Sequence, residues 1–245
     1  MKYQIGYDYV LIQQYGLKLP IQVSAESHMI IVGASGSGKS TALLYILHKM
    51  TSCNNVALTI CDFKSSHEFT GISSKFAEFE DCYDTICDFY EEFLATPEGG
   101  TDKIKILLID EIAGLLTHFS ATKETKEKAE RIRQIMSSIL MLGRSRKCFL
   151  ILSCQRFSAS IMPAGSGAAD NFHVCLGLGR LSVESRKSLF AGEHFEEEDT
   201  LLFGQGRGII LIDGEPIKAI AIPKVSKTKL LSLLQERNEG ARSAT

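Results

Sequence analysis

Short apolar runs alternate with longer amphipathic segments along most of the chain. Short, mostly apolar runs predict buried strands, here over residues 29–32, 56–60, 104–109, 149–153, 173–178 and 208–212. Apolar residues at helical spacing predict helices, here over residues 42–47, 76–94, 122–142 and 226–238. Short apolar runs around turns over residues 3–27 predict a hairpin-like β segment ahead of the first buried strand.

The alternation of strands and helices predicts an α/β fold. Strands that alternate with helices pair in parallel through right-handed crossovers. We therefore expect a central, mostly parallel sheet flanked by helices. The chain shows no internal repeat, no low-complexity tract and no clear domain linker.

The segment 76–94 carries several acidic residues and no basic ones. Its aromatic and aliphatic residues recur at helical spacing, which predicts an amphipathic helix with an acidic outer face. Solvation explains such a face more simply than a binding partner does, and a partner site is the alternative.

Composition narrows the class of protein. With 245 residues, 44% of them hydrophobic, the chain has enough apolar material for one large α/β domain or two small ones. A net charge of −2 gives no global basic field, so contact with a polyanion would depend on local patches. The seven cysteines form no C-x-x-C pair, which indicates free thiols in a reducing compartment.

Targeting signals are absent from the sequence. No apolar run approaches the ~20 residues that span a bilayer. The N-terminus lacks the apolar core of a signal peptide. We therefore expect a cytoplasmic protein, with peripheral membrane association through a partner left open.

A glycine-rich segment follows the first apolar run. Residues 33–41 read GASGSGKST and fit G-x-x-x-x-G-K-[ST] between a predicted strand and a predicted helix. Such a loop binds nucleotide phosphates through its backbone N–H groups, whereas a flexible Gly/Ser loop is the alternative. The nucleotide-binding candidates are Ala34, Ser35, Gly36, Ser37, Gly38, Lys39, Ser40 and Thr41. Lys39 is suited to the β- and γ-phosphates, and Ser40 to Mg²⁺.

Asp110 and Glu111 come directly after the apolar run 104–109. The carboxyl ends of parallel strands collect ligands in an open α/β sheet. Asp110 is therefore a candidate for the Mg²⁺ shell beside Ser40. Glu111 is a candidate for polarising a water that attacks the γ-phosphate. The alternative is that this acidic pair only caps the next helix.

Gln155 follows the run 149–153 and is a candidate sensor of the γ-phosphate. A ring-forming NTPase also needs a cation that offsets transition-state charge, supplied across a subunit boundary. Arg144 and Arg186 are the first candidates, with Arg207 and Arg146 behind them. For each arginine, a surface salt bridge or a DNA-phosphate contact accounts for the charge equally well.

Several motifs in order resemble one family, from about residue 28 to about residue 208. The matching segments are HMIIVG with GSGKS (28–40), ICDFK with Glu68 and Gly71-Ile72, DEIAGL (110–115), Arg144, SCQRFS (153–158), ESR (184–186) and LFGQGRG (202–208). They resemble the motifs of the FtsK/SpoIIIE family of DNA-pumping ATPases, within the FtsK–HerA superfamily. Departures from the family pattern are Gly114, Phe157 and Gly208.

The resemblance implies a RecA-like P-loop ATPase with ATP and Mg²⁺, assembled as a hexamer that threads double-stranded DNA without sequence specificity. It implies a β lead-in over residues 1–27 packed on the motor, the ATPase domain over 28–222, and a C-terminal helix and tail over 223–245. It assigns Lys39 and Ser40 to phosphate and Mg²⁺, Asp110 and Glu111 to metal and water, and Gln155 to sensing.

Full-length chromosome translocases of this family have a membrane-spanning N-terminus and a C-terminal winged-helix module, and we expect neither in residues 1–245. The expectation is a compact motor of the kind that mobile elements use for conjugative or phage DNA, with a relaxase, another DNA-loading protein or a membrane protein as partner. Three functions remain open: a DNA translocase, an ATPase that energises protein secretion or assembly, and a nucleotide-dependent scaffold without turnover.

Overall fold

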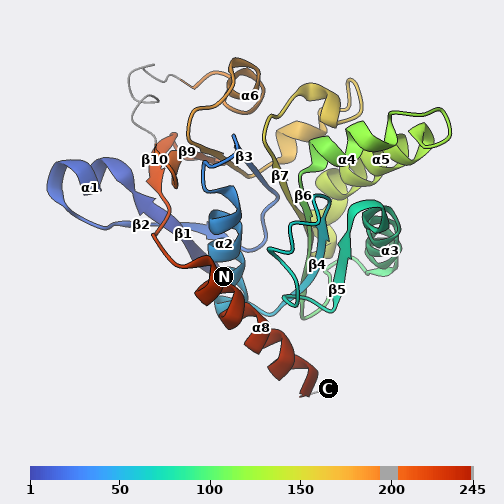
Figure 1. Ribbon diagram of the computed structural model, residues 1–245, viewed down its shortest axis with the longest axis horizontal. Coiled ribbons are helices and arrows are strands. Elements are labelled where there is room, and N and C mark those ends of the chain that lie inside the picture. Colours follow the sequence, from blue (N-terminus) through green and yellow to red (C-terminus); the bar gives the residue numbers. More distant parts are fainter. Residues whose placement is uncertain (194–203, 244–245) are drawn as a thin grey trace.

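A ten-stranded sheet runs through the computed structural model, which describes residues 1–193 and 204–243 (Figure 1). The strands are β1 (Lys2–Asp8), β2 (Pro20–Ser24), β3 (Met29–Gly33), β4 (Val56–Asp62), β5 (Lys75–Glu78), β6 (Ile104–Asp110), β7 (Cys148–Cys154), β8 (Val174–Leu178), β9 (Arg207–Ile212) and β10 (Lys218–Ala221). Their spatial order is β2-β1-β10-β9-β8-β3-β7-β6-β4-β5.

The sheet has a parallel part and an antiparallel part. Strands β8, β3, β7, β6, β4 and β5 are parallel to one another. Strands β9, β10, β1 and β2 continue the sheet beyond β8 in antiparallel pairs. The predicted α/β fold with a mostly parallel sheet and flanking helices is confirmed.

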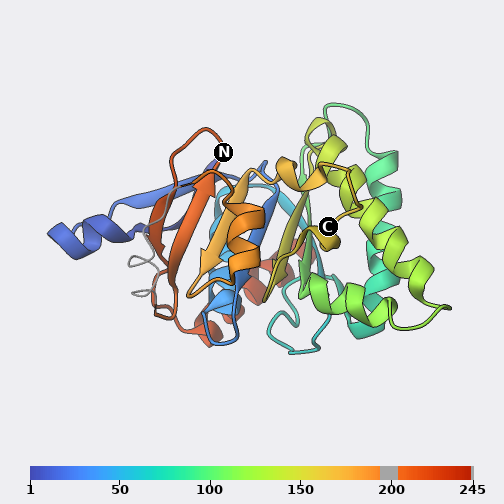
Figure 2. The same cartoon turned by 90° about the horizontal axis from the view of Figure 1, so that it is seen from above.

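Helices cover both faces of the sheet (Figure 2). One face packs against α3 (Cys82–Ala95), α4 (Ile112–Phe119) and α5 (Lys126–Leu142), and the other against α2 (Lys39–Cys53) and α8 (Lys227–Ser243). Alternate residues of β3 enter the two cores: Ile30 and Val32 belong to the first, Met29 and Ile31 to the second. Because successive strand residues point to opposite faces, one apolar run supplies both cores.

The predicted helix over 76–94 is wrong in its first part. Residues Lys75–Glu78 form β5, which pairs in parallel with β4, and a 3₁₀ turn follows before α3 begins at Cys82. Phe79 has a left-handed backbone (φ 49°), which interrupts a helix at that residue. Pairing with the sheet edge therefore overrides the helical spacing of the first aromatic residues.

The N-terminal segment is also corrected. Strands β1 and β2 form the expected hairpin, but helix α1 (Tyr9–Tyr15) lies in their connection. Asp8 caps α1 by accepting a hydrogen bond from the N–H of Leu11, and Gly16 ends it in a left-handed conformation. The sequence patterns also did not predict α4, α6 (Val183–Leu189) or β10. Among the described residues, no helix is both long and apolar enough to cross a membrane.

Candidate nucleotide site

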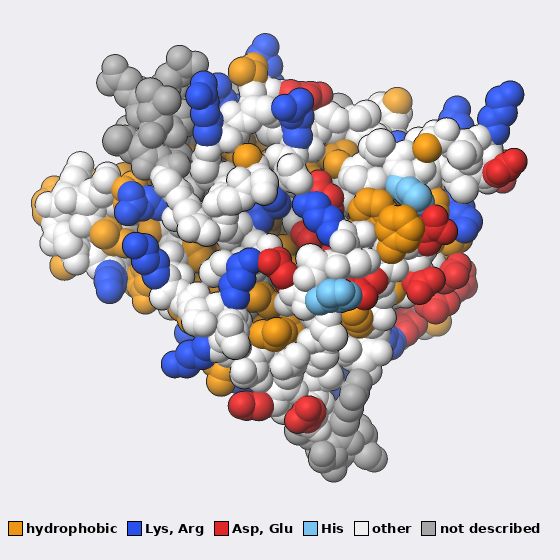
Figure 3. Space-filling model, in the orientation of Figure 1, with side chains coloured by type: hydrophobic (Ala, Val, Ile, Leu, Met, Phe, Trp, Pro, Cys, Tyr) orange, Lys and Arg blue, Asp and Glu red, His pale blue; other side chains and the backbone are white. Residues whose placement is uncertain are grey.

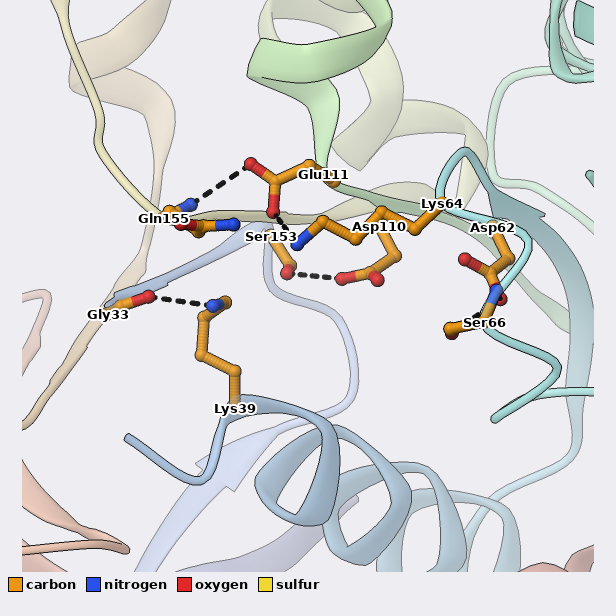
Figure 4. Close-up of polar contacts among 9 residues, drawn as sticks. All are labelled: Gly33, Lys39, Asp62, Lys64, Ser66, Asp110, Glu111, Ser153 and Gln155. Carbon is orange, nitrogen blue, oxygen red and sulfur yellow. Dashed lines mark hydrogen bonds and ion pairs between the residues drawn. The ribbon is translucent and has the colours of Figure 1, made fainter. Parts of the chain in front are cut away.

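The carboxyl ends of four parallel strands meet at one edge of the sheet (Figure 4). Asp62 at the end of β4 pairs in register with Asp110 at the end of β6, and Val32 of β3 pairs with Cys154 of β7. Because β7 lies between β3 and β6, the glycine loop, the acidic pair and Gln155 come together at this edge. Sequence segments more than a hundred residues apart thus form one constellation.

The glycine loop connects β3 to α2 in a shape that only small residues permit. Gly36 and Gly38 have left-handed backbones (φ 78° and 97°). A Cβ on Gly33 would lie 2.6 Å from both the Leu178 carbonyl oxygen and the Ser37 hydroxyl. Helix α2 begins at Lys39, so the N–H groups of its first turn, at Lys39 to Thr41, face the loop. Ala34, Ser35 and Gly36 are exposed at its mouth.

The loop fits a phosphate group by its own chemistry. The Ser37 hydroxyl is buried and has no hydrogen-bond partner among the described residues. The N-terminal N–H groups of α2 and the helix dipole favour an anion at this position. The loop residues Gly33 to Ser40 therefore fit the phosphates of a nucleotide.

Lys39 points from the start of α2 toward β3, where its Nζ donates a 2.7 Å hydrogen bond to the Gly33 carbonyl oxygen (Figure 4). Burial lowers the pKa of Lys39, and the nearby Glu111 and Asp110 carboxylates act in the opposite sense. The Lys39 ammonium thus interacts electrostatically with both acids.

Asp110 ends β6 and is almost completely buried. One of its oxygens, Oδ1, accepts a 2.5 Å hydrogen bond from the Ser153 hydroxyl of β7. Burial raises the pKa of Asp110, while the Ser153 hydrogen bond favours the charged form. The sequence analysis gave Ser153 no role, although it is the first residue of the motif SCQRFS.

Glu111 follows with a left-handed backbone (φ 56°) and begins α4. Its Oε2 lies 2.5 Å from Lys64 Nζ, and its Oε1 accepts a 3.3 Å hydrogen bond from the N–H of Gln155. The carboxylate therefore bridges the ends of β4 and β7. The Gln155 side chain itself is exposed and can approach a ligand.

Ser40 contacts an acid to which the sequence patterns gave no role. Burial raises the pKa of Glu68, but hydrogen bonds from Lys227 and Ser40 outweigh burial and lower it overall. The Lys227 Nζ lies 2.5 Å from Glu68 Oε1. In the sequence Glu68 is part of the motif that begins with ICDFK, without a role assigned to it.

The candidate arginines are not at one place. Arg144 precedes β7 and is exposed, so the whole strand, about 23 Å at 3.3 Å per residue, separates it from this chain's own site. Arg186 lies on α6, which follows the carboxyl end of β8 at the edge that carries the site. Arg146 is an anchor: its guanidinium donates to the Leu94 and Thr96 carbonyl oxygens. Of the motif 202–208, residues 202–203 lie outside the described ranges.

Metal-ligating side chains are few in the described part of the chain, where no group of three His, Cys, Asp or Glu residues could hold an ion. Mg²⁺ at a nucleotide site takes most of its ligands from phosphates and water, with one or two protein oxygens. Ser40 and Asp110, at the two sides of the loop, fit that smaller set of ligands.

Comparison with known proteins agrees with this geometry. Residues 12–75, which include the whole glycine loop, match the model of the FtsK/SpoIIIE family. The resemblance inferred from the motifs is thereby confirmed over these residues. No curated protein matches the chain.

Solved structures of FtsK/SpoIIIE-like ATPases share the fold. The cytoplasmic domain of the type VII secretion ATPase EccC from Thermomonospora curvata is 16% identical over 97% of this chain and 31% of its own, with a TM-score of 0.71. EssC (ATPases 2 and 3) from Geobacillus thermodenitrificans is 14% identical over 98% of this chain and 49% of its own, with a TM-score of 0.68. This chain thus spans half or less of these two proteins.

A third similar structure is that of a conjugation coupling protein. The pCW3 conjugation coupling protein TcpA, in a monomer form with ATPγS, is 19% identical over 94% of this chain and 74% of its own, with a TM-score of 0.61. An ATP analogue therefore accompanies the same fold in a similar protein. At these identities the likeness establishes the fold, and the residues of the site carry the chemistry.

Proposed function

We propose that this chain is an ATP-hydrolysing motor that moves double-stranded DNA, as a ring hexamer, in conjugative or mobile-element transfer or in segregation. The observation that carries the ATPase part is the meeting of the glycine loop with Asp110, Glu111 and Gln155 at one sheet edge. The FtsK/SpoIIIE match and the likeness to a conjugation coupling protein support DNA as the substrate.

Each residue has a task in this proposal. The loop N–H groups and Lys39 bind the phosphates, and Ser40 and Asp110 hold Mg²⁺, which neutralises phosphate charge. Glu111 accepts a proton from the attacking water, and the Gln155 side chain orients that water. Ser153 keeps Asp110 oriented through its hydrogen bond.

The positions of the two arginines decide which nucleotide each could serve as a trans-acting cation. Arg144 lies at the opposite sheet edge, so it can serve only the nucleotide of a neighbouring copy. Arg186 is the second candidate, and it lies at the same sheet edge as the nucleotide site of its own chain.

We propose the domain division expected from the motifs, with residues 1–27 as a lead-in, 28–222 as the motor and 223–245 as a C-terminal helix and tail.

Exposed lysines offer a surface for DNA phosphates. Asp and Glu side chains gather on the right of Figure 3, over α3, whereas Lys and Arg side chains are spread across the left and upper parts of this face. Exposed lysines of the N-terminal hairpin, of the segment leading into α8 and of the first turn of α8 include Lys2, Lys18, Lys224 and Lys229. Contacts of this kind are sequence-independent and weaken steeply with salt.

The test is the ATPase rate with and without linear duplex DNA, together with the mass in solution in the presence of a non-hydrolysable ATP analogue. We expect duplex DNA to raise turnover at low salt, the stimulation to fall as salt increases, and the analogue to favour the hexamer. Glu111→Gln should reduce turnover about 100-fold or more while nucleotide still binds. Glu91→Gln, at an exposed position of α3, is the matched control.

A DNA motor is ruled out if duplex DNA changes neither turnover nor oligomeric state at low salt. A Glu111→Gln variant with wild-type turnover would remove the role given to Glu111. A chain that binds ATP without any turnover would instead be a nucleotide-dependent scaffold.

Protein secretion is the second candidate, because two of the similar structures are EccC, a type VII secretion ATPase, and the related protein EssC. This alternative predicts turnover that a protein substrate raises and that DNA leaves unchanged. Binding partners isolated with the Glu111→Gln variant, followed by ATPase assays with each partner, separate the two functions.

A further inference from the structure

The connection between β4 and β5, residues 63–74, lies between the candidate site and helix α8. Its backbone includes left-handed residues at Ser65 and His67 (φ 49° and 57°) and at Gly71 (φ 81°). Phe69 in its middle is fully buried, in the same cluster as Leu230 of α8. The connection is thus packed against the C-terminal helix.

At one end of this connection, Lys64 holds Glu111. Lys64 Nζ lies 2.5 Å from Glu111 Oε2, while Glu111 Oε1 accepts the Gln155 N–H at 3.3 Å (Figure 4). Both carboxylate oxygens are therefore engaged by this chain's own groups. A carboxylate that accepts a proton from water needs an oxygen directed at that water, so the Lys64 ion pair competes with this role.

At the other end, three side chains of α8 hold the connection. Lys227 Nζ lies 2.5 Å from Glu68 Oε1. Gln235 Nε2 donates to the Thr70 carbonyl oxygen at 2.7 Å, and Asn238 Nδ2 donates to the Gly71 carbonyl oxygen at 3.0 Å. Interactions with Lys227 and with Ser40 at the start of α2 lower the pKa of Glu68.

We propose that Lys64 is a positioning residue that holds Glu111 in a resting orientation, and that α8 sets the place of Lys64 through residues 64–71. The inference rests on the proposed ATPase function. A displacement of α8 by a partner would move the connection, release Glu111 Oε2 and raise turnover. The C-terminal helix is therefore the point at which a partner can control hydrolysis.

A first experiment needs no nucleotide. The Gln155 amide donates to Glu111, so its hydrogen-exchange rate, measured by NMR, reports where Glu111 is. We expect Lys64→Met to speed this exchange about tenfold, and Lys227→Met to speed it about threefold. The controls are Lys75→Met, which breaks the Lys75–Glu92 ion pair elsewhere, and Lys229→Met, at an exposed position of α8. Both should leave the Gln155 amide unchanged.

A second experiment measures coupling. Without DNA or protein partner, we expect Lys64→Met to raise kcat about fivefold with KM unchanged, and Lys227→Met about twofold. In the Lys64→Met background, Lys227→Met should not raise kcat further, because the Lys64–Glu111 ion pair through which α8 acts is already absent. Two effects that simply multiply would show that α8 acts without Lys64.

The outcomes separate this inference from the proposed function. If the wild type hydrolyses ATP but Lys64→Met changes neither Gln155 exchange nor kcat, the inference is wrong and the ATPase stands. If Lys64→Met lowers turnover and raises KM, Lys64 binds nucleotide instead of holding Glu111. If the wild type shows no turnover while Gln155 exchange responds as expected, the ATPase proposal fails and the contact through Lys64 stands.

Discussion

The two parts of the sheet differ in how they are covered. Every residue of β7, in the parallel part, is buried, because helices lie over both of its faces. In the antiparallel part, β2 alternates exposed and buried positions, so that only one of its faces is packed. The parallel part gathers its strand ends at one edge and forms the site. The antiparallel part reverses direction at every strand and gathers no such ends.

The parts join at β8 and β9, where their backbones come very close. A Cβ on Gly208 of β9 would lie 1.8 Å from the Gly177 carbonyl oxygen of β8. No side chain fits at residue 208 unless this backbone moves. The joint therefore depends on glycine for its geometry, and substitutions on either side of it test how far the two parts depend on each other.

The largest expected effect is at this joint. Gly208→Ala should destabilise the protein by about 3 kcal/mol or more, because the clash is with backbone that cannot rotate away. Urea denaturation measures the loss. Gly214→Ala, in the β9–β10 turn, is the control: its φ of 74° is unfavourable but no atom lies within 4 Å, so about 1 kcal/mol is expected. Equal losses of unfolding free energy in the two variants would mean that the close backbone contact at Gly208 does not contribute to stability.

The next effect is a pH dependence from the start of β3. Burial, with a smaller contribution from the nearby His173, lowers the pKa of His28 to about 3. An unfolded chain takes up this proton near pH 6.5, whereas the folded chain stays neutral, so stability falls as pH decreases below 6.5. The slope from His28 is about 1.4 kcal/mol per pH unit.

Unfolding free energies between pH 7 and pH 5 measure this slope, and His28→Leu should reduce it. His67→Leu is the matched control, because the His67 side chain is 74% exposed. An unchanged slope in His28→Leu would mean that other groups govern the acid response.

A smaller effect is expected at the site itself. Ser153→Ala removes the hydrogen bond to the buried Asp110 and should destabilise the protein by about 1–2 kcal/mol. Turnover should also fall about tenfold, since Asp110 loses the group that orients it. Ser158→Ala, which removes only the contact with Ser160, is the control for losing a hydroxyl. Wild-type turnover in Ser153→Ala would contradict the orienting role.

The smallest effect is expected far out in the antiparallel part. Leu17 follows α1 and is 60% exposed. Leu17→Ser should change the free energy of unfolding by less than about 0.5 kcal/mol and leave the basal ATPase rate unchanged. A larger change in either quantity would show that the end of the hairpin is packed against something in solution or communicates with the site.

The same contrast governs what the sequence could predict. The buried parallel strands were predicted because continuous apolar runs such as 104–109 are too short for a buried helix and too apolar for a loop, and the strand ends follow from them. The glycine loop was predicted because a tight backbone turn with positive φ requires glycine at fixed positions, which gives a recognisable sequence pattern. Helix α1 was missed because its helix depends on an Asp8 cap and a Gly16 end rather than on apolar spacing.

Contacts between segments that are distant in the sequence could not be predicted from the sequence. Strand β5 was taken for helix because pairing with β4 is visible only in three dimensions. The partners of Glu111 come from Lys64 and Gln155, which follow two other strands, and no spacing rule joins them. The sequence thus indicated which residues have suitable chemistry, but not which other side chains hold them in place.

Glu111 occupies a backbone conformation that suits glycine or asparagine better than glutamate. If Glu111 has the role proposed for it, the most stable residue and the most active residue at this position between β6 and α4 differ. An engineered form that does not need hydrolysis would then gain backbone stability from glycine or asparagine here, at the loss of a carboxylate held in this direction.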